Sequence, residues 1–183
     1  MASKRKRRSL RQQTTELPPS ESTATLPVLA ALADDSAQTN QRTAKRAAQM
    51  LVEDRLGFVV PTGRQRVAIL QAFARDEQVV YGKAFDIVKK PTEMDLDDVE
   101  SIYRNIDELL VCEIKSTNNT SVKENFDGYF FAITAGEMLT AQSLGDRYRF
   151  VFVNTITREY LDQTLRQIFA RSRGIYPTWS VRF

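Results

Sequence analysis

The chain has 183 residues, of which 42% are hydrophobic, so it is long enough for one domain with an apolar core. It contains no histidine and a single cysteine, Cys112, and these counts exclude an internal disulfide, zinc sites built from cysteine and histidine, and nucleophiles activated by histidine. Any metal must therefore bind mainly through carboxylate oxygens, which favours magnesium, manganese or calcium.

The net charge of +3 is unevenly distributed. Residues 1–11 contain six basic residues and no acid, which leaves 20 basic and 23 acidic residues in the remainder. The basic cluster fits three interpretations: additional attraction to phosphates, a nuclear address in a eukaryotic cell, or a solvated end of the chain. Residues 9–41 are rich in polar residues, proline and alanine. We therefore expect a basic, mostly disordered tail and linker over residues 1–41 and a folded domain over residues 42–183.

The sequence has no apolar stretch near the roughly 18 residues of a membrane span, and no apolar signal core follows the basic amino terminus. We expect a soluble intracellular protein with no membrane partner. Its expected location is the cytoplasm or the nucleoid, or the nucleus in a eukaryotic cell.

A helix is predicted from Arg42, because apolar residues recur at helical spacing up to Gly57, a residue type that often follows a helix end. Residues 58–61 then form a short strand or a turn. A capping-box pattern begins at Thr62 and predicts a second helix up to about Asp76.

Two segments rich in β-forming residues follow, at 79–81 and 84–88. They flank Gly82, which predicts one bent strand or a hairpin. The second segment carries an acid, Asp86, within its apolar pattern. Asp95 is then expected to cap a helix that leads into the next strand.

The stretch from Leu109 to Thr117 predicts a buried strand that carries two opposite charges two residues apart. Since side chains alternate between the faces of a strand, Glu113 and Lys115 stand side by side on one face. Buried charges are costly unless they meet partners, water or a metal, so this pair marks a candidate site. The alternative is a cross-strand ion pair on a half-exposed sheet.

A polar loop separates this strand from residues 129–133, which form a strand or lead into a helix. The spacing from Thr134 to Glu137 is that of another capping box. The capping box explains both residues without any catalysis. Substitution of either is therefore expected to act mainly on stability.

Residues 147–153 alternate as a strand, and their aromatic side chains are expected in the core. Thr157 is expected to cap a helix that ends at Gly174, and residues 179–183 predict a closing edge strand. Together these elements predict an α/β domain with a mixed sheet between helices. Three arginines near the last helix either contact phosphates or are solvated: Arg166, Arg171 and Arg173.

Four pieces in this order resemble the PD-(D/E)XK nuclease superfamily, and most closely its restriction-endonuclease-like domains of the NO VEIN carboxy-terminal type. The resemblance covers about residues 42–155. It implies a restriction-endonuclease-like, three-layer α/β/α fold with a central mixed sheet. The pieces are Phe85-Asp86-Ile87, Glu113-Ile114-Lys115-Ser116-Thr117, Thr134-Ala135-Gly136-Glu137 and Tyr148-Arg149-Phe150.

The resemblance implies a magnesium- or manganese-dependent endonuclease that hydrolyses DNA phosphodiester bonds, for example in a restriction or defence system. Asp86, Glu113 and the carbonyl of Ile114 would hold the metal, and Lys115 would orient a water molecule or stabilise the transition state. Gln49, at the place of a helical glutamate in such domains, would bind the site through a water. Cleavage of both strands by one site per chain suits a homodimer. The alternatives are a catalytically silent nuclease-like fold that binds nucleic acid or protein, and a small structural domain.

Overall fold

The computed structural model describes residues 42–54 and 56–176. The predicted tail and linker over residues 1–41 and the predicted strand over residues 179–183 lie outside this range. None of the helices within the described range is long and apolar enough to cross a membrane.

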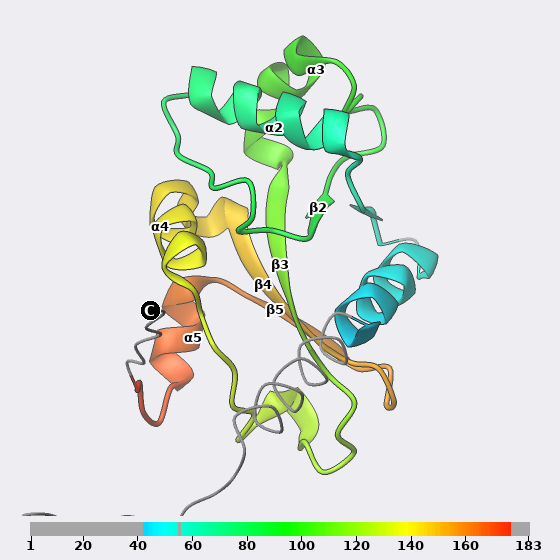
Figure 1. Cartoon of the computed structure of the whole chain (residues 1–183), viewed down its shortest axis with the longest axis vertical. Coiled ribbons are helices and arrows are strands. Elements are labelled where there is room, and N and C mark those ends of the chain that lie inside the picture. The colour runs from blue at the N-terminus through cyan, green and yellow to red at the C-terminus, as the bar shows by residue number, and fades with distance from the viewer. Residues whose placement is uncertain (1–41, 55, 177–183) are drawn as a thin grey trace, which may run out of the picture. The chain divides into compact units, whose positions relative to one another are not determined.

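A five-stranded mixed sheet organises the described residues (Figure 1), which confirms the predicted α/β class. The strands are adjacent in chain order, and β3 and β4 are parallel while every other neighbouring pair is antiparallel. The strands are β1 (Phe58–Val59), β2 (Ile87–Lys89), β3 (Leu110–Thr117), β4 (Tyr148–Asn154) and β5 (Tyr160–Gln163).

Helices surround this sheet, and the two predicted capping boxes begin two of them. Thr62 and Gln65 start α2, and Thr134 and Glu137 start α4, each pair with both reciprocal hydrogen bonds formed. Residues 42–53 are also helical, as predicted. The labelled helices are α2 (Gly63–Arg75), α3 (Val99–Arg104), α4 (Ala135–Leu144) and α5 (Leu165–Arg171).

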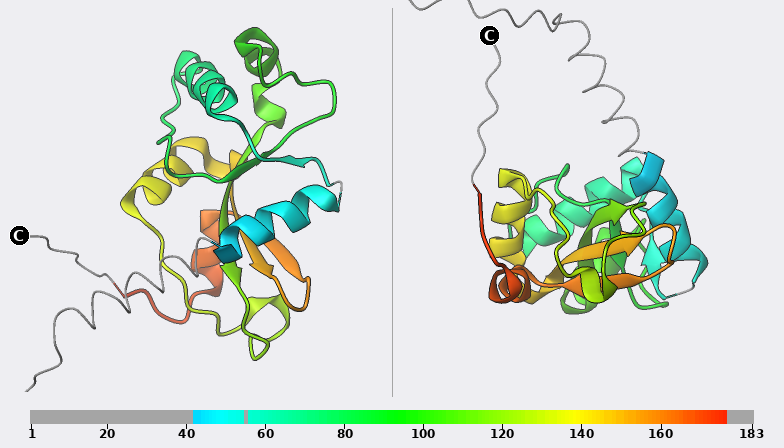
Figure 2. Two further views of the ribbon diagram at one scale, coloured as in Figure 1. Left: turned by 45° about the vertical axis from the view of Figure 1, so that its right-hand side comes forward. Right: turned by 90° about the horizontal axis from the view of Figure 1, so that it is seen from below.

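The two faces of the sheet belong to two hydrophobic clusters. On one face, residues of β2, β3 and β4 pack with Ala47, Met50 and Leu51 of the helical stretch over 42–53. On the other face, the alternate residues of the same strands pack with residues of α2, α3, α4 and α5. Figures 1 and 2 show the helical stretch over 42–53 on one side of β3 and α4 on the other. One face of the core is thus mainly apolar, with the Arg149–Asp162 pair of β4 and β5 at its edge, and Asp86, Glu113 and Lys115 lie on the other face.

The predicted strand at residues 79–81 is wrong, because its backbone donors bond to side chains of α4 instead of a neighbouring strand. The amide of Val79 donates to Ser143 Oγ at 2.7 Å, and that of Tyr81 donates to Thr140 Oγ1 at 3.2 Å. The second segment does form a strand, β2, but only from Ile87 onward. Asp86 therefore precedes the strand directly.

Two predicted helix starts are also wrong. Asp95 closes a turn by accepting from the amide of Asp97, and Asp98 caps the six-residue α3 instead. Thr157 lies in the turn between β4 and β5, where Arg158 has a positive φ of 62°. Thr164 caps α5 instead, with a complete capping box.

Residues 129–133 form no strand and lead into α4, the second of the two predicted possibilities.

Candidate active site

The alternation of β3 places Glu113 and Lys115 on the face covered by α4. Asp86 reaches the same face because β2 runs antiparallel to β3, with Ile87 opposite Cys112. Its Oδ2 accepts a hydrogen bond of 3.0 Å from the amide of Ile114, the residue between Glu113 and Lys115. The structure therefore brings Asp86, Glu113 and Lys115 together.

Lys115 lies between two carboxylates. Its Nζ donates to Glu113 Oε1 at 3.2 Å and to Glu137 Oε2 at 2.7 Å. The three side chains are 12%, 13% and 6% exposed, in the order Lys115, Glu113, Glu137, so the contacts are shielded from bulk water. The ammonium group is consequently held in one place at the surface of the strand.

Glu137 has two functions in this arrangement. Its Oε2 accepts from the amide of Thr134 at 3.1 Å, which completes the predicted capping box, and the same oxygen accepts from Lys115. The cap is confirmed, but the interpretation of Glu137 as a cap alone missed the contact with Lys115. The sequence offers no local sign of that contact, because the two residues come from different elements.

Arg66 on α2 is a second residue that the sequence reasoning missed. Its guanidinium donates to the carbonyls of Phe85 at 2.7 Å, Gly82 at 3.1 Å and Asp86 at 3.4 Å, and it lies 4.0 Å from the centre of the Phe85 ring. These contacts hold the turn that leads into Asp86. The hydroxyl of Tyr148 donates to the carbonyl of Ala84 and fixes the same turn from β4.

Negative charge is in excess within this group, because three carboxylates face two cations when all are ionised. Burial raises the pKa of Asp86, although the amide of Ile114, Lys115 and Arg66 oppose the increase. Burial and then the nearby charge of Asp86 raise the pKa of Glu113 to about 8, against the attraction of Lys115. The arrangement thus disfavours full ionisation of its acids and favours an additional cation.

The donor set fits a hard metal ion. Within residues 42–54 and 56–176, no hydrogen bond reaches Asp86 Oδ1 or Glu113 Oε2, so one oxygen of each acid has no protein donor there. The carbonyl of Ile114 points to the same side of β3 as its amide, which bonds to Asp86. No group of three or more acidic or thiol side chains in the described residues is arranged to hold a metal alone, so a metal here would also need this carbonyl and water.

Gln49 does not join the group. It is exposed, and the buried residues of its helical stretch, Ala47 and Met50 among them, pack on the opposite face of the sheet. Its predicted contact with the site through a water has no support in this arrangement.

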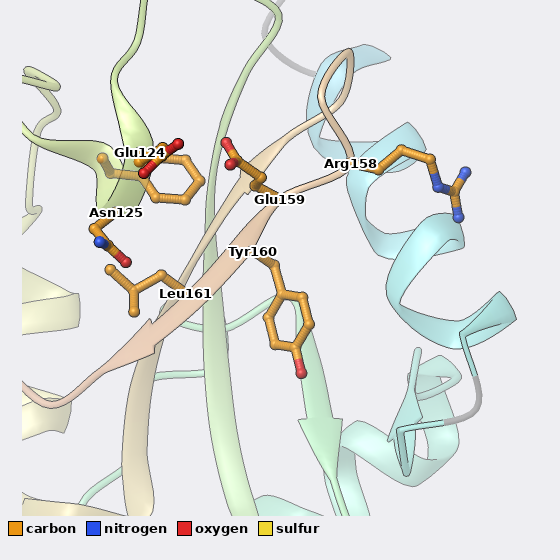
Figure 3. A pocket seen from close by; sticks show the side chains of 7 residues that line it. Glu124, Asn125, Arg158, Glu159, Tyr160 and Leu161 are labelled. Carbon is orange, nitrogen blue, oxygen red and sulfur yellow. The ribbon is translucent and has the colours of Figure 1, made fainter.

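A hollow of about 370 Å³ lies elsewhere, between the turn before β5 and the segment over residues 124–126 (Figure 3). Glu124, Asn125, Arg158 and Tyr160 are among its lining residues, and none of the clustered charges around Lys115 contributes to it. The candidate site is therefore defined by its side chains and not by this hollow.

No protein-family model, curated protein or solved structure matches the chain. The arrangement itself offers two carboxylates, each with an oxygen that has no donor in the described residues, together with a backbone carbonyl and a fixed lysine. These groups can bind a divalent cation and stabilise negative charge beside it.

Proposed function

We propose that this protein is a magnesium- or manganese-dependent endonuclease that hydrolyses DNA phosphodiester bonds, on a restriction-endonuclease-like, three-layer α/β/α domain. The proposal depends on the convergence of Asp86, Glu113 and Lys115, in which one oxygen of each acid has no hydrogen-bond donor in the described residues. The element order agrees with the resemblance. A helical stretch precedes Asp86 and β2, the charged pair follows on β3, and α4 leads to a parallel β4.

In this proposal Asp86, Glu113 and the carbonyl of Ile114 would hold the metal ion. When bound, the ion would lower the pKa of a coordinated water and neutralise charge that grows on the phosphate. Arg66 keeps Asp86 in place through the three carbonyls it binds. The chain thus supplies a preformed set of oxygen donors at the start of β2 and the middle of β3.

Lys115 supplies a compact positive charge beside the metal ligands. Its contacts with Glu113 and Glu137 fix the ammonium group, so little reorganisation is needed when negative charge develops on a phosphate nearby. Glu137 acts through Lys115 and is a positioning residue.

A purely structural ion pair explains less of the site. It accounts for the two contacts of Lys115, but it does not explain why a third acid, Asp86, lies beside them and accepts from the amide of Ile114. Buried ion pairs are also weak contributors to stability, because desolvation offsets much of the attraction.

The test is cleavage of duplex DNA by the full chain with Mg²⁺, with Ca²⁺ and with a chelator. We expect hydrolysis with Mg²⁺, binding without hydrolysis with Ca²⁺ and no hydrolysis with the chelator. Glu113→Gln should lose both metal binding and cleavage, whereas Lys115→Ala should bind metal and still fail to cut. Binding without cleavage by the parent in Mg²⁺ would identify a silent nuclease-like module. Equal cleavage by the parent and both variants would remove these residues from the reaction.

A further inference from the structure

The segment that leads into α4 presents one aromatic ring to solvent. Tyr129, Phe131 and Ile133 are partly buried and pack against the core, while the intervening Phe130 is 77% exposed. No other large hydrophobic side chain in the described range is more exposed. An exposed phenylalanine forgoes the burial that normally places this residue type inside a protein.

The exposure of Phe130 is not a property of a loose chain, because its neighbours are anchored. The hydroxyl of Tyr129 donates to the carbonyl of Ser116 at 2.9 Å. The Phe131 ring packs edge-on against Phe152, with 4.8 Å between the ring centres. The backbone therefore holds the Phe130 ring away from the core.

The same anchors place the segment along Lys115. Ser116 follows Lys115 directly, and Phe152 is the partner of Lys115 in the parallel register of β3 and β4. At the end of the segment, the amide of Thr134 bonds to the same Glu137 oxygen that accepts from Lys115. Phe130 thus lies on a segment that contacts the surroundings of Lys115 at three points.

A cation lies beside the start of this segment. Arg171 at the end of α5 donates through Nη2 to the carbonyl of Asn125 at 2.6 Å, and it is exposed. It forms no ion pair with any acid of the described ranges, whereas its neighbour Arg173 pairs with Asp127 at 2.8 Å. Figures 1 and 2 show the segment passing beside α5 on its way to α4.

We infer that Phe130 and Arg171 form a subsite for one unpaired nucleotide, next to the phosphate bound at Asp86, Glu113 and Lys115. The base stacks on the Phe130 ring and the guanidinium of Arg171 contacts a phosphate of the same strand. A base can offer its face to a ring only when it leaves the stack of a duplex, so the preferred substrate is DNA with a single-stranded segment. The inference rests on the proposed nuclease function.

The test is binding of a labelled single-stranded oligonucleotide and of its duplex to the full chain with Ca²⁺, followed by fluorescence anisotropy. Phe130→Leu should weaken binding of the single strand by about tenfold and change duplex binding less, and Phe130→Trp should bind like the parent. Phe169→Leu is the matched control, because it makes the same change at another exposed phenylalanine, 42% exposed, that the subsite does not include. For the single strand, Arg171→Gln should make the slope of log affinity against log salt concentration shallower by about 0.7.

Three results would overturn the subsite. If the parent and Phe130→Leu bind the single strand with equal affinity, no base stacks on Phe130. That result would not affect the proposed cleavage at Asp86 and Glu113. Loss of binding with tryptophan as well as leucine would show that the side chain supports the fold and not a base. A parent chain that binds no DNA would overturn both the subsite and the nuclease proposal.

Discussion

The two faces of β2 and β3 differ in chemistry although they share the same backbone. Ile87, Cys112 and Ile114 point to one face and pack among apolar side chains of the helical stretch over 42–53. Their chain neighbours Asp86 and Glu113 point to the other face, where they lie among charged groups inside an otherwise apolar layer. Burial of apolar area explains most of the first face, because it stabilises the chain. The Arg149–Asp162 pair is a charged exception on that face.

Folding does not explain the second face. Removal of charges from water costs free energy, and an ion pair in a protein interior returns only part of it. Burial is the main cause that raises the pKa values of Asp86 and Glu113, and repulsion from neighbouring carboxylates adds to it. Under the proposed function, these acids are present on this face because they bind a cation.

The largest effect is expected from Asp86→Asn, which should reduce Mg²⁺-dependent DNA cleavage by about a hundredfold or more, because it removes a charged metal ligand. Asp162→Asn is the matched control. Asp162 also lies in the sheet, but it pairs with Val151 of the apolar face and lies 3.6 Å from Arg149. The cleavage rate of Asp86→Asn should be lower than that of Asp162→Asn by about a hundredfold or more. Similar losses of cleavage in both variants would contradict the assignment of Asp86 to the active site.

The next effect concerns the residue directly after Asp86. Ile87→Ala should lower the free energy of unfolding by about 2–5 kcal/mol, because Ile87 is completely buried on the apolar face. Asp86→Asn should leave the unfolding free energy unchanged or higher, since asparagine keeps an oxygen that can accept from the amide of Ile114. Denaturant titration of both variants with a chelator present measures the contrast. A larger loss in Asp86→Asn would make the acid a structural residue.

A smaller effect separates the two residues of the α4 capping box. Glu137→Gln should lower turnover by about tenfold, because the partner that fixes Lys115 loses its charge. Thr134→Ala should reduce stability by about 1 kcal/mol and leave turnover of the folded protein unchanged. Turnover measured well below each variant's melting temperature distinguishes the two. Unchanged turnover in Glu137→Gln would return Glu137 to the function of a cap alone.

The last prediction concerns the pH dependence of stability without metal. The pKa of Glu113 in the folded chain is raised from 4.5 to about 8. Folding therefore favours the protonated acid, and stability should fall as the pH rises from about 4.5 to about 8. Glu113→Gln should show a shallower fall over this interval in denaturant titrations. A parent whose stability rises relative to the variant over the same interval would contradict the sign.

The sequence predicted those features of the site that depend on local rules. The period of two along β3 placed Glu113 beside Lys115, and the Thr134 capping box started α4 as expected. Arg66 and the contact between Lys115 and Glu137 could not be predicted, because each joins elements that only the tertiary fold brings together.

The wrong predictions have two different causes. Residues 79–81 have strong β propensity, but their amides bond to α4, so a distant partner overrides a local preference. The start of α5 could have been predicted, because Thr164 is followed three residues later by Gln167, a capping-box pair that Thr157 lacks.

The most direct test of cation binding at the charged face is thermal unfolding of the parent and Glu113→Gln with a chelator and with excess Mg²⁺ or Ca²⁺. If the charged face binds a cation, the metal should stabilise the parent and raise its melting temperature. At a free metal concentration ~100 times the dissociation constant, the gain in stability is about 2.7 kcal/mol. Glu113→Gln should be at least as stable as the parent with the chelator and should gain nothing from the metal. A parent that does not respond to metal, together with a Glu113→Gln variant less stable than the parent, would show that these charges stabilise the fold and bind no cation.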